Sequence, residues 1–146
     1  MKQGNIKERI LGAWEMVSFL IHLPDGRTLS GLGRGGRGSI VYTADNYVSV
    51  NLTRGDRPRP LSDTIFHELP DDAIGQICRG FMSYSGPYEV HEDRQLLIHH
   101  YRFCLDPLLV GTLQERYVRF DGDLLELSVR EAEGVSYPST ITWRRP

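Results

Sequence analysis

The sequence has few cysteines, no long apolar run and no excess of positive charge, and each shortage excludes a class of protein. Cys78 and Cys104 are the only cysteines, too few and too far apart for a zinc motif. We expect free thiols, although a disulfide between them stays open. No stretch approaches the roughly 18 apolar residues of a membrane span. Asp and Glu outnumber Lys and Arg by 19 to 17, which disfavours a nucleic-acid partner.

Targeting, cofactor and metal signals are also missing. Residues 1–10 contain no apolar segment of signal-peptide length, so we expect a cytoplasmic protein. The glycine-rich segment 31–38 matches GxGxxG, but it leads into an expected strand, whereas a nucleotide-binding motif leads from a strand into a helix. No group of His, Cys and carboxylate residues has metal-ligand spacing, so we predict neither a cofactor nor a metal. The 146 residues are the size of one domain, which we place over 1–146.

What the sequence contains is a series of short segments rich in aromatic and β-branched residues, separated by turn residues. We predict a short helix over 5–11, a second helix over 70–79, and about eight strands. Their close spacing favours a closed antiparallel barrel or a sandwich over a fold of alternating strands and helices. The expected strands are 14–21, 40–43, 47–53, 81–90, 96–104, 113–120, 125–130 and 139–144.

Strand 113–120 carries two polar residues on an otherwise apolar stripe. Gln114, Arg116, Val118 and Phe120 are alternate residues of this strand and so lie on the same face. All four therefore face the interior if Val118 and Phe120 do. Arginine supplies a planar fork of donors and glutamine an amide. The pair could therefore hold a carboxylate, enolate or carbonyl group of a ligand. The alternative is a structural network, since a buried arginine needs a partner, a ligand or water.

Strand 96–104 supplies a second candidate, His99, which shares a face with Leu97, Tyr101 and Phe103. An interior histidine can act as a general acid or base near neutral pH, or it can be a core residue held by hydrogen bonds. His100 faces outward by the same parity. Tyrosines give apolar area with a polar tip, and four of them are candidates for either a pocket wall or the barrel core: Tyr42, Tyr84, Tyr88 and Tyr101.

These segments occur in an order that resembles the lipocalin-like domain proteins of bacteria and fungi. Gly12-Ala13-Trp14 is similar to the Gly-x-Trp opening of lipocalins, and Pro107, Gly111-Thr112, Gln114 and Arg116 follow at the family's spacing. The resemblance implies a closed up-and-down β-barrel rather than a sandwich. It also implies that Trp14 closes one end of the barrel beneath Arg144. Further matching segments are 40–47, 84–90, the pair 99–100, 121–123 and 142–145.

Three functions remain open at this point. The first is a binding protein that holds a hydrophobic small molecule in a cavity of about 300 Å³ or more, anchored by Gln114 and Arg116 and walled by His99 and the four tyrosines. The second is a cofactor-free cyclase or isomerase of natural-product biosynthesis of the polyketide type, with His99 and Arg116 as catalytic residues. The third is a structural module with a filled core. A homodimer formed through an exposed sheet edge or segment 31–38 also stays open.

Overall fold

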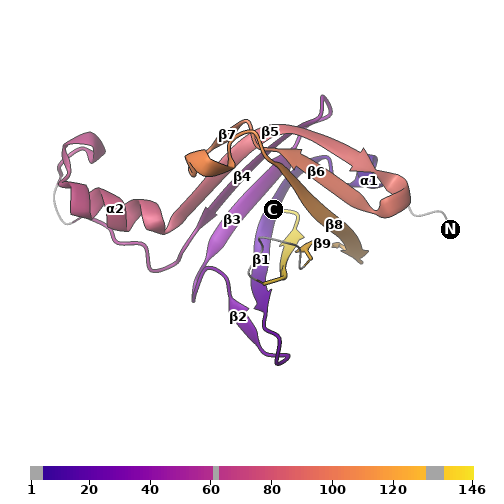
Figure 1. Ribbon diagram of the computed structural model, residues 1–146, viewed down its shortest axis with the longest axis horizontal. Coiled ribbons are helices and arrows are strands. Elements are labelled where there is room, and N and C mark those ends of the chain that lie inside the picture. The colour runs from indigo at the N-terminus through magenta and orange to yellow at the C-terminus, as the bar shows by residue number, and fades with distance from the viewer. Residues whose placement is uncertain (1–4, 61–62, 131–136) are drawn as a thin grey trace.

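The chain is described by a computed structural model that covers residues 5–60, 63–130 and 137–146. In these ranges the fold consists mainly of β-strands, which are connected by turns and short helices (Figure 1). The elements in chain order are α1 (Ile6–Arg9), β1 (Gly12–His22), β2 (Thr28–Ser30), β3 (Arg37–Tyr42), β4 (Tyr47–Thr53), the 3-10 turn η1 (Phe66–Glu68), α2 (Asp71–Arg79), β5 (Phe81–His91), η2 (Glu92–Arg94), β6 (Leu96–His100), β7 (Phe103–Cys104), η3 (Pro107–Leu109), β8 (Leu113–Asp121), β9 (Leu124–Val129) and β10 (Ser139–Arg144).

The strands form a closed antiparallel barrel. The ring runs β1, β3, β4, β5, β6, β8, β9, β10, and β10 returns to pair with β1, so that Met16 lies opposite Trp143 and Ile21 opposite Ser139. This closure confirms the predicted barrel of about eight strands and excludes the sandwich, in which the first and last strands of the ring would not meet. The short strand β2, which pairs with β1, was not expected, and residues 103–104, predicted as the end of strand 96–104, form a separate strand β7 that pairs with β5.

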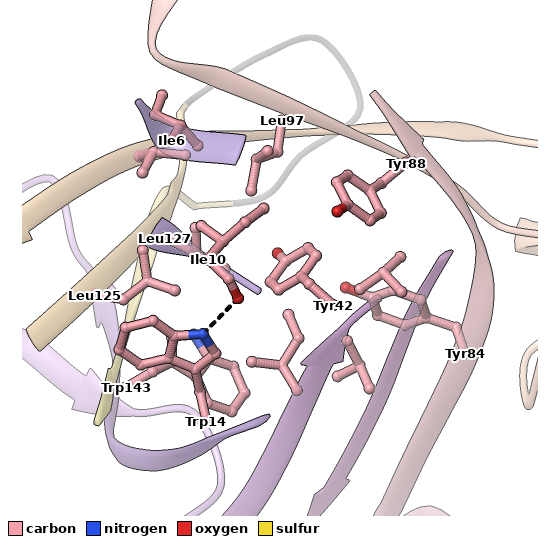
Figure 2. Close-up of a cluster of buried hydrophobic side chains, with 14 of the residues drawn as sticks. Ile6, Ile10, Trp14, Tyr42, Tyr84, Tyr88, Leu97, Leu125, Leu127 and Trp143 are labelled. Carbon is pink, nitrogen blue, oxygen red and sulfur yellow. Dashed lines mark hydrogen bonds between the residues drawn. The ribbon is translucent and has the colours of Figure 1, made fainter. Parts of the chain in front are cut away.

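Helix α1 covers one end of the barrel. The side chain of Asn5 caps it by accepting a hydrogen bond from the backbone N–H of Glu8 at 2.9 Å, as its capping residue predicts. Ile6 and Ile10 point into the core and are 7% and 0% exposed. The indole N–H of Trp14 donates to the carbonyl of Ile10 at 2.8 Å (Figure 2). Burial of an isoleucine stabilises the fold by about 1.5–3 kcal/mol, so both isoleucines hold α1 in place.

The prediction that Arg144 covers the Trp14 ring is wrong, because the neighbouring Arg145 does so. The guanidinium that lies over the Trp14 ring, 3.7 Å from its centroid, belongs to Arg145 and not to Arg144. Trp143 faces the interior and is 1% exposed, so alternation along β10 turns Arg144 outward. Arg145 follows the end of the strand, where it is free to fold back and donate to the carbonyl of Ala13 at 3.1 Å.

The strand predicted over 96–104 is interrupted. Strand β6 ends at His100, and the N–H of Tyr101 donates across to the carbonyl of Thr112. A Cβ atom added at Gly86 would lie 1.8 Å from the His100 carbonyl oxygen, so only glycine allows β5 to approach so closely. Pairing resumes at β7 with the parity reversed. Phe103 is therefore 64% exposed, and its expected inward position is wrong.

The inward faces of the strands, together with α1, form one core cluster. Figure 2 shows aliphatic side chains near α1 and a group of tyrosines further along the interior. This division matters for function, because the polar atoms of the tyrosines lie inside the barrel. The residues of β3 to β6 with buried side chains are Ile40, Tyr42, Val48, Val50, Leu52, Tyr84, Tyr88, Leu96, Leu97 and His99.

Both cysteines are free thiols and half-buried, so the possible Cys78–Cys104 disulfide is not formed. Among the described residues, no helix combines the length and the apolar character that crossing a membrane requires.

Candidate functional site

The barrel interior contains a cavity of about 160 Å³ beside the tyrosine group. It is smaller than the expected size, and three aromatic residues, Tyr84, Tyr101 and Trp143, form part of its wall. An apolar protein cavity of roughly 150 Å³ accommodates benzene, so this space fits a single ring. Most of the remaining lining is apolar: Phe19, Ile40, Val50, Leu52, Met82, Leu127, Val129 and Ile141.

Arg116 supplies the only charged side chain among the described residues that line this cavity. Its Nη2 donates to the Tyr101 hydroxyl oxygen at 2.9 Å, and its Nη1 donates to the carbonyl of Glu115 at 2.9 Å. Within the described ranges it forms no ion pair with a carboxylate. Burial acts to lower the pKa of Arg116, but the phenols of Tyr84, Tyr101 and Tyr42 outweigh it and leave that pKa raised. The cavity wall therefore carries a fixed positive charge.

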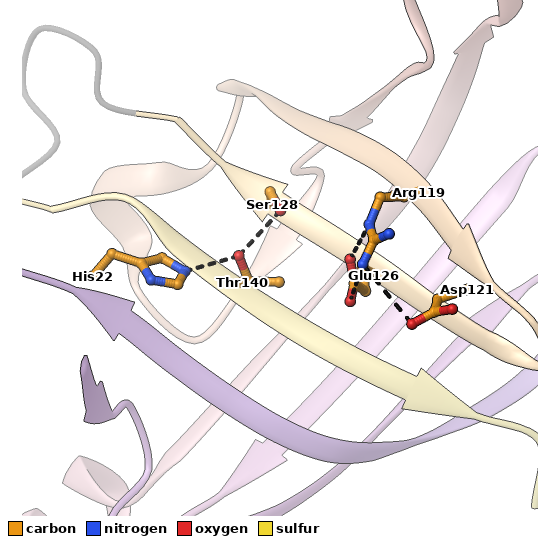
Figure 3. Close-up of polar contacts among 6 residues, drawn as sticks. All are labelled: His22, Arg119, Asp121, Glu126, Ser128 and Thr140. Atoms are coloured by element: carbon orange, nitrogen blue, oxygen red, sulfur yellow. Dashed lines mark hydrogen bonds and ion pairs between the residues drawn. The ribbon is translucent and has the colours of Figure 1, made fainter. Parts of the chain in front are cut away.

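Arg119, on the same strand, shows the opposite arrangement. It lies on the outer face, where its Nε contacts Glu126 Oε2 at 2.6 Å and its Nη2 contacts Glu126 Oε1 at 3.0 Å (Figure 3). Asp121 lies 3.9 Å from the same guanidinium. Residues 116 and 119 have opposite parity on β8, so one arginine points to the cavity and the other to solvent.

His99 is fully buried behind the cavity wall and links two tyrosines. Its Nε2 lies 2.8 Å from the Tyr42 hydroxyl, and its Nδ1 lies 2.9 Å from the Tyr84 hydroxyl. Burial lowers the pKa of His99 well below its usual value, and the nearby positive charges of Arg116 and His100 lower it further. The imidazole is therefore neutral at pH 7. Of the three linked side chains, Tyr84 alone lines the cavity.

The structure separates the remaining predicted site residues from the cavity wall. The Tyr88 hydroxyl donates to the carbonyl of Thr43 at 2.9 Å, and its ring meets the Tyr42 ring edge-on at a centroid distance of 5.0 Å. Gln114 is half-buried and donates from Nε2 to the Thr112 hydroxyl at 2.9 Å. Tyr88 packs behind the wall, and Gln114 does not join Arg116 there.

Trp143 is a cavity residue that sequence reasoning missed. Its indole Nε1 is buried and has no hydrogen-bond partner among the described residues. An unsatisfied buried donor costs about 1–3 kcal/mol, and this N–H is buried away from the open space of the cavity. The parity of β10, which Ile141 shares, was the signal that could have placed Trp143 inside.

Other polar groups lie on the outer face of the barrel. His22 Nε2 is 3.0 Å from the Thr140 hydroxyl, which in turn lies 3.1 Å from the Ser128 hydroxyl (Figure 3). His100 contacts the Glu89 carboxylate on the outside of β6, as its parity predicts. The part of the chain that the structure describes contains no group of three or more His, Cys, Asp and Glu residues able to hold a metal ion.

A closed barrel with an interior cavity defines the lipocalin class of small-molecule-binding folds. Comparison with known proteins agrees: the model of the lipocalin-like domain family matches residues 11–146, and the chain belongs to this family. A curated relative is the 4'-hydroxy-3'-methoxypropiophenone carrier protein ppsC of Aspergillus oryzae. It is 31% identical over 84 residues, which cover 51% of this chain and 76% of that protein. No solved structure gives a significant match.

Proposed function

We propose that the barrel binds and carries a small, mostly apolar molecule with one ring and a hydrogen-bond acceptor. The observation that carries this proposal is the 160 Å³ cavity, whose apolar wall is broken by the guanidinium of Arg116. Apolar walls supply affinity, and a few polar groups fix orientation. The proposed anchor is Arg116 with the hydroxyls of Tyr84 and Tyr101. Gln114 is not part of it, because its amide is turned toward Thr112.

The relative from Aspergillus oryzae supports this proposal through its name. That protein is named as a carrier of 4'-hydroxy-3'-methoxypropiophenone, which is an aromatic ketone with a single ring. A molecule of this class combines a flat apolar ring with oxygen acceptors. These are the two properties that the cavity wall of this chain matches. We extend the carrier role, but not that particular ligand, to this protein.

Native mass spectrometry of freshly purified protein tests the carrier role. We expect a fraction of the protein to carry a bound small molecule that is released on unfolding. Arg116→Met should lose this adduct, whereas Arg119→Met, which removes a guanidinium from the outer face of the same strand, should keep it. Protein without an adduct that also fails to bind single-ring compounds in calorimetry would overturn the carrier proposal.

A cofactor-free cyclase or isomerase is the second candidate, because a protonatable chain reaches the cavity. His99 joins the buried Tyr42 to Tyr84 at the cavity wall, and a guanidinium beside it can stabilise an enolate-like transition state. An enzyme predicts that His99→Gln and Arg116→Met abolish product formation while a ligand still binds. If binding occurs without chemistry and neither substitution changes the products in the source organism, the enzyme proposal fails.

The cellular location and the oligomeric state also belong to the proposal. A cytoplasmic location accords with two free thiols, since disulfides are rare in reducing compartments. Cell fractionation checks it. A homodimer remains a prediction that light scattering of the purified protein decides.

A further inference from the structure

The polar groups of the cavity wall include one that only donates, the guanidinium of Arg116. The other described polar side chains that line the cavity with oxygen atoms are the hydroxyls of Tyr84, Tyr101 and Ser139, which can donate or accept. No carboxylate occurs among the described residues that line the cavity. A ligand that fills the cavity therefore meets a positive charge and hydrogen-bond donors.

The hydrogen bonds of His99 determine which nitrogen of its ring carries the proton, and this in turn affects the Tyr84 hydroxyl. A neutral imidazole has one donor nitrogen and one acceptor nitrogen. Tyr42 is 1% exposed, and its hydroxyl has a single hydrogen-bond partner within the described ranges, the Nε2 of His99. If Nε2 carried the proton, the Tyr42 hydroxyl proton would be buried without an acceptor, at a cost of about 1–3 kcal/mol. The Tyr42 hydroxyl therefore donates to Nε2.

The proton of His99 then lies on Nδ1, which donates to the Tyr84 hydroxyl oxygen at 2.9 Å. Since that oxygen already accepts from the imidazole, the Tyr84 hydroxyl proton is available to another acceptor. The candidates are the Tyr101 hydroxyl, which interacts with Tyr84, and a ligand oxygen in the cavity that Tyr84 lines. The buried chain from Tyr42 through His99 thus keeps the Tyr84 hydroxyl available as a donor.

Trp143 does not add to this set of donors. Its indole N–H is buried and has no acceptor among the described residues. Because a water-sized probe does not reach this nitrogen, the indole lines the cavity with its carbon atoms. The ligand-facing donors are therefore those of Arg116 and the hydroxyls.

We propose that the ligand binds as an anion, a single-ring compound whose negatively charged oxygen lies against Arg116 and the Tyr84 hydroxyl. This inference rests on the proposed binding function and narrows its ligand class. A charged acceptor makes hydrogen bonds about twice as strong as a neutral one does. It also neutralises the guanidinium, which has no carboxylate partner in the described part of the chain. A cationic ring of the same shape would meet repulsion and unmatched donors.

Three probes of nearly identical shape test the inference by calorimetry at pH 7: benzoate, an anion with acceptors only; benzamide, neutral with both; and benzamidine, a cation with donors only. We expect benzoate to bind tightest and benzamidine at least about tenfold more weakly. Arg116→Met should remove this preference, and Arg119→Met should retain it. A melting curve for each variant checks that it is folded.

The possible failures are distinguishable. If benzamide or benzamidine binds as tightly as benzoate, the anionic ligand is overturned while the binding function stands. If Arg116→Met leaves the benzoate preference intact, the assigned anchor is overturned. If none of the three probes binds and the purified protein carries no adduct, the binding function itself is overturned, and the inference with it.

Discussion

The ring of Tyr84 stacks on the ring of Tyr101, with centroids 3.8 Å apart and planes inclined by 22°. The stack holds Tyr101, which lies in the interruption between β6 and β7, against Tyr84 of β5, and both residues line the cavity. Tyr101 accepts a hydrogen bond from Arg116, and Tyr84 contacts His99. Aromatic pairs of this kind contribute about 0.5–1.5 kcal/mol beyond burial, so the anchor rests on a rigid support.

Removal of the Tyr84 hydroxyl should separate its polar role from its packing role. Tyr84→Phe retains the stack but leaves the Nδ1–H of His99 without an acceptor, so we expect a loss of about 1–3 kcal/mol in the free energy of unfolding. Benzoate affinity should fall as well, because one donor is lost. Tyr117→Phe is the matched control. Tyr117 lies on β8, and the variant removes its hydroxyl but keeps the ring on which the Arg130 guanidinium lies. Denaturation and calorimetry report the two effects, and an unchanged benzoate affinity would contradict the assigned role.

The tautomer of His99 is a direct consequence of the hydrogen-bond arrangement. In ¹⁵N NMR spectra of the imidazole, we expect Nδ1 to be protonated and Nε2 to be unprotonated at pH 7. Tyr42→Phe removes the hydroxyl that donates to Nε2, so the variant should show a mixture of the two tautomers. A wild-type spectrum with the proton on Nε2 would contradict the proposed orientation of the Tyr84 hydroxyl.

Stability should fall in acid because of His99. Its folded pKa lies well below that of the unfolded chain, chiefly through burial, so the unfolded state binds a proton that the folded state excludes. The contribution of His99 is complete above the unfolded pKa of about 6.5 and is lost as the pH falls below it. The free energy of unfolding then decreases by up to about 1.4 kcal/mol per pH unit.

Urea denaturation between pH 7 and pH 5 measures this slope. His99→Gln, which cannot titrate, should flatten the curve over this interval even if it lowers the overall stability. His67→Gln, on the exposed turn η1, is the control and should keep the wild-type slope. Equal slopes in all three proteins would show that His99 is not a buried neutral group.

Replacement by alanine should have opposite effects on stability at Gly86, where β5 closely approaches the end of β6, and at Gly75. In Gly86→Ala the new methyl group would overlap the His100 carbonyl oxygen, so we expect a loss of about 3 kcal/mol, at the upper end for overpacking. Gly75 lies in helix α2 and its nearest neighbour is 4.0 Å from an added Cβ. Gly75→Ala should therefore stabilise by about 0.5–1 kcal/mol. Thermal melts compare the two, and equal effects would argue against the described geometry.

Strand parity predicted the parts of the site that lie on unbroken strands. Arg116 reaches the cavity because β8 alternates regularly from residue 113 to 121, and His99 is interior because it lies before the end of β6. Phe103 lies beyond that end, where hydrogen bonds cross to other segments, and alternation no longer applies. Such a break depends on the close contact between Gly86 and His100, which sequence spacing does not reveal.

The alternation of a strand predicts the face on which a side chain lies, but it does not predict the hydrogen bonds of its polar atoms. Gln114 has the same parity as Arg116, yet its amide donates to the nearby Thr112 hydroxyl. The free N–H of Trp143 depends on which acceptors surround it in three dimensions. Likewise, Arg145 covers Trp14 because it lies past the last strand residue, where the alternation that placed Arg144 has ceased.

A crystal structure of the protein with benzoate shows whether a ligand occupies the cavity beside Arg116. We expect electron density for the ring among Val50, Leu127 and Ile141. The carboxylate should lie within hydrogen-bond distance of the Arg116 guanidinium and the Tyr84 hydroxyl. An empty cavity at saturating benzoate, or a ring whose carboxylate points away from Arg116, would contradict this expectation.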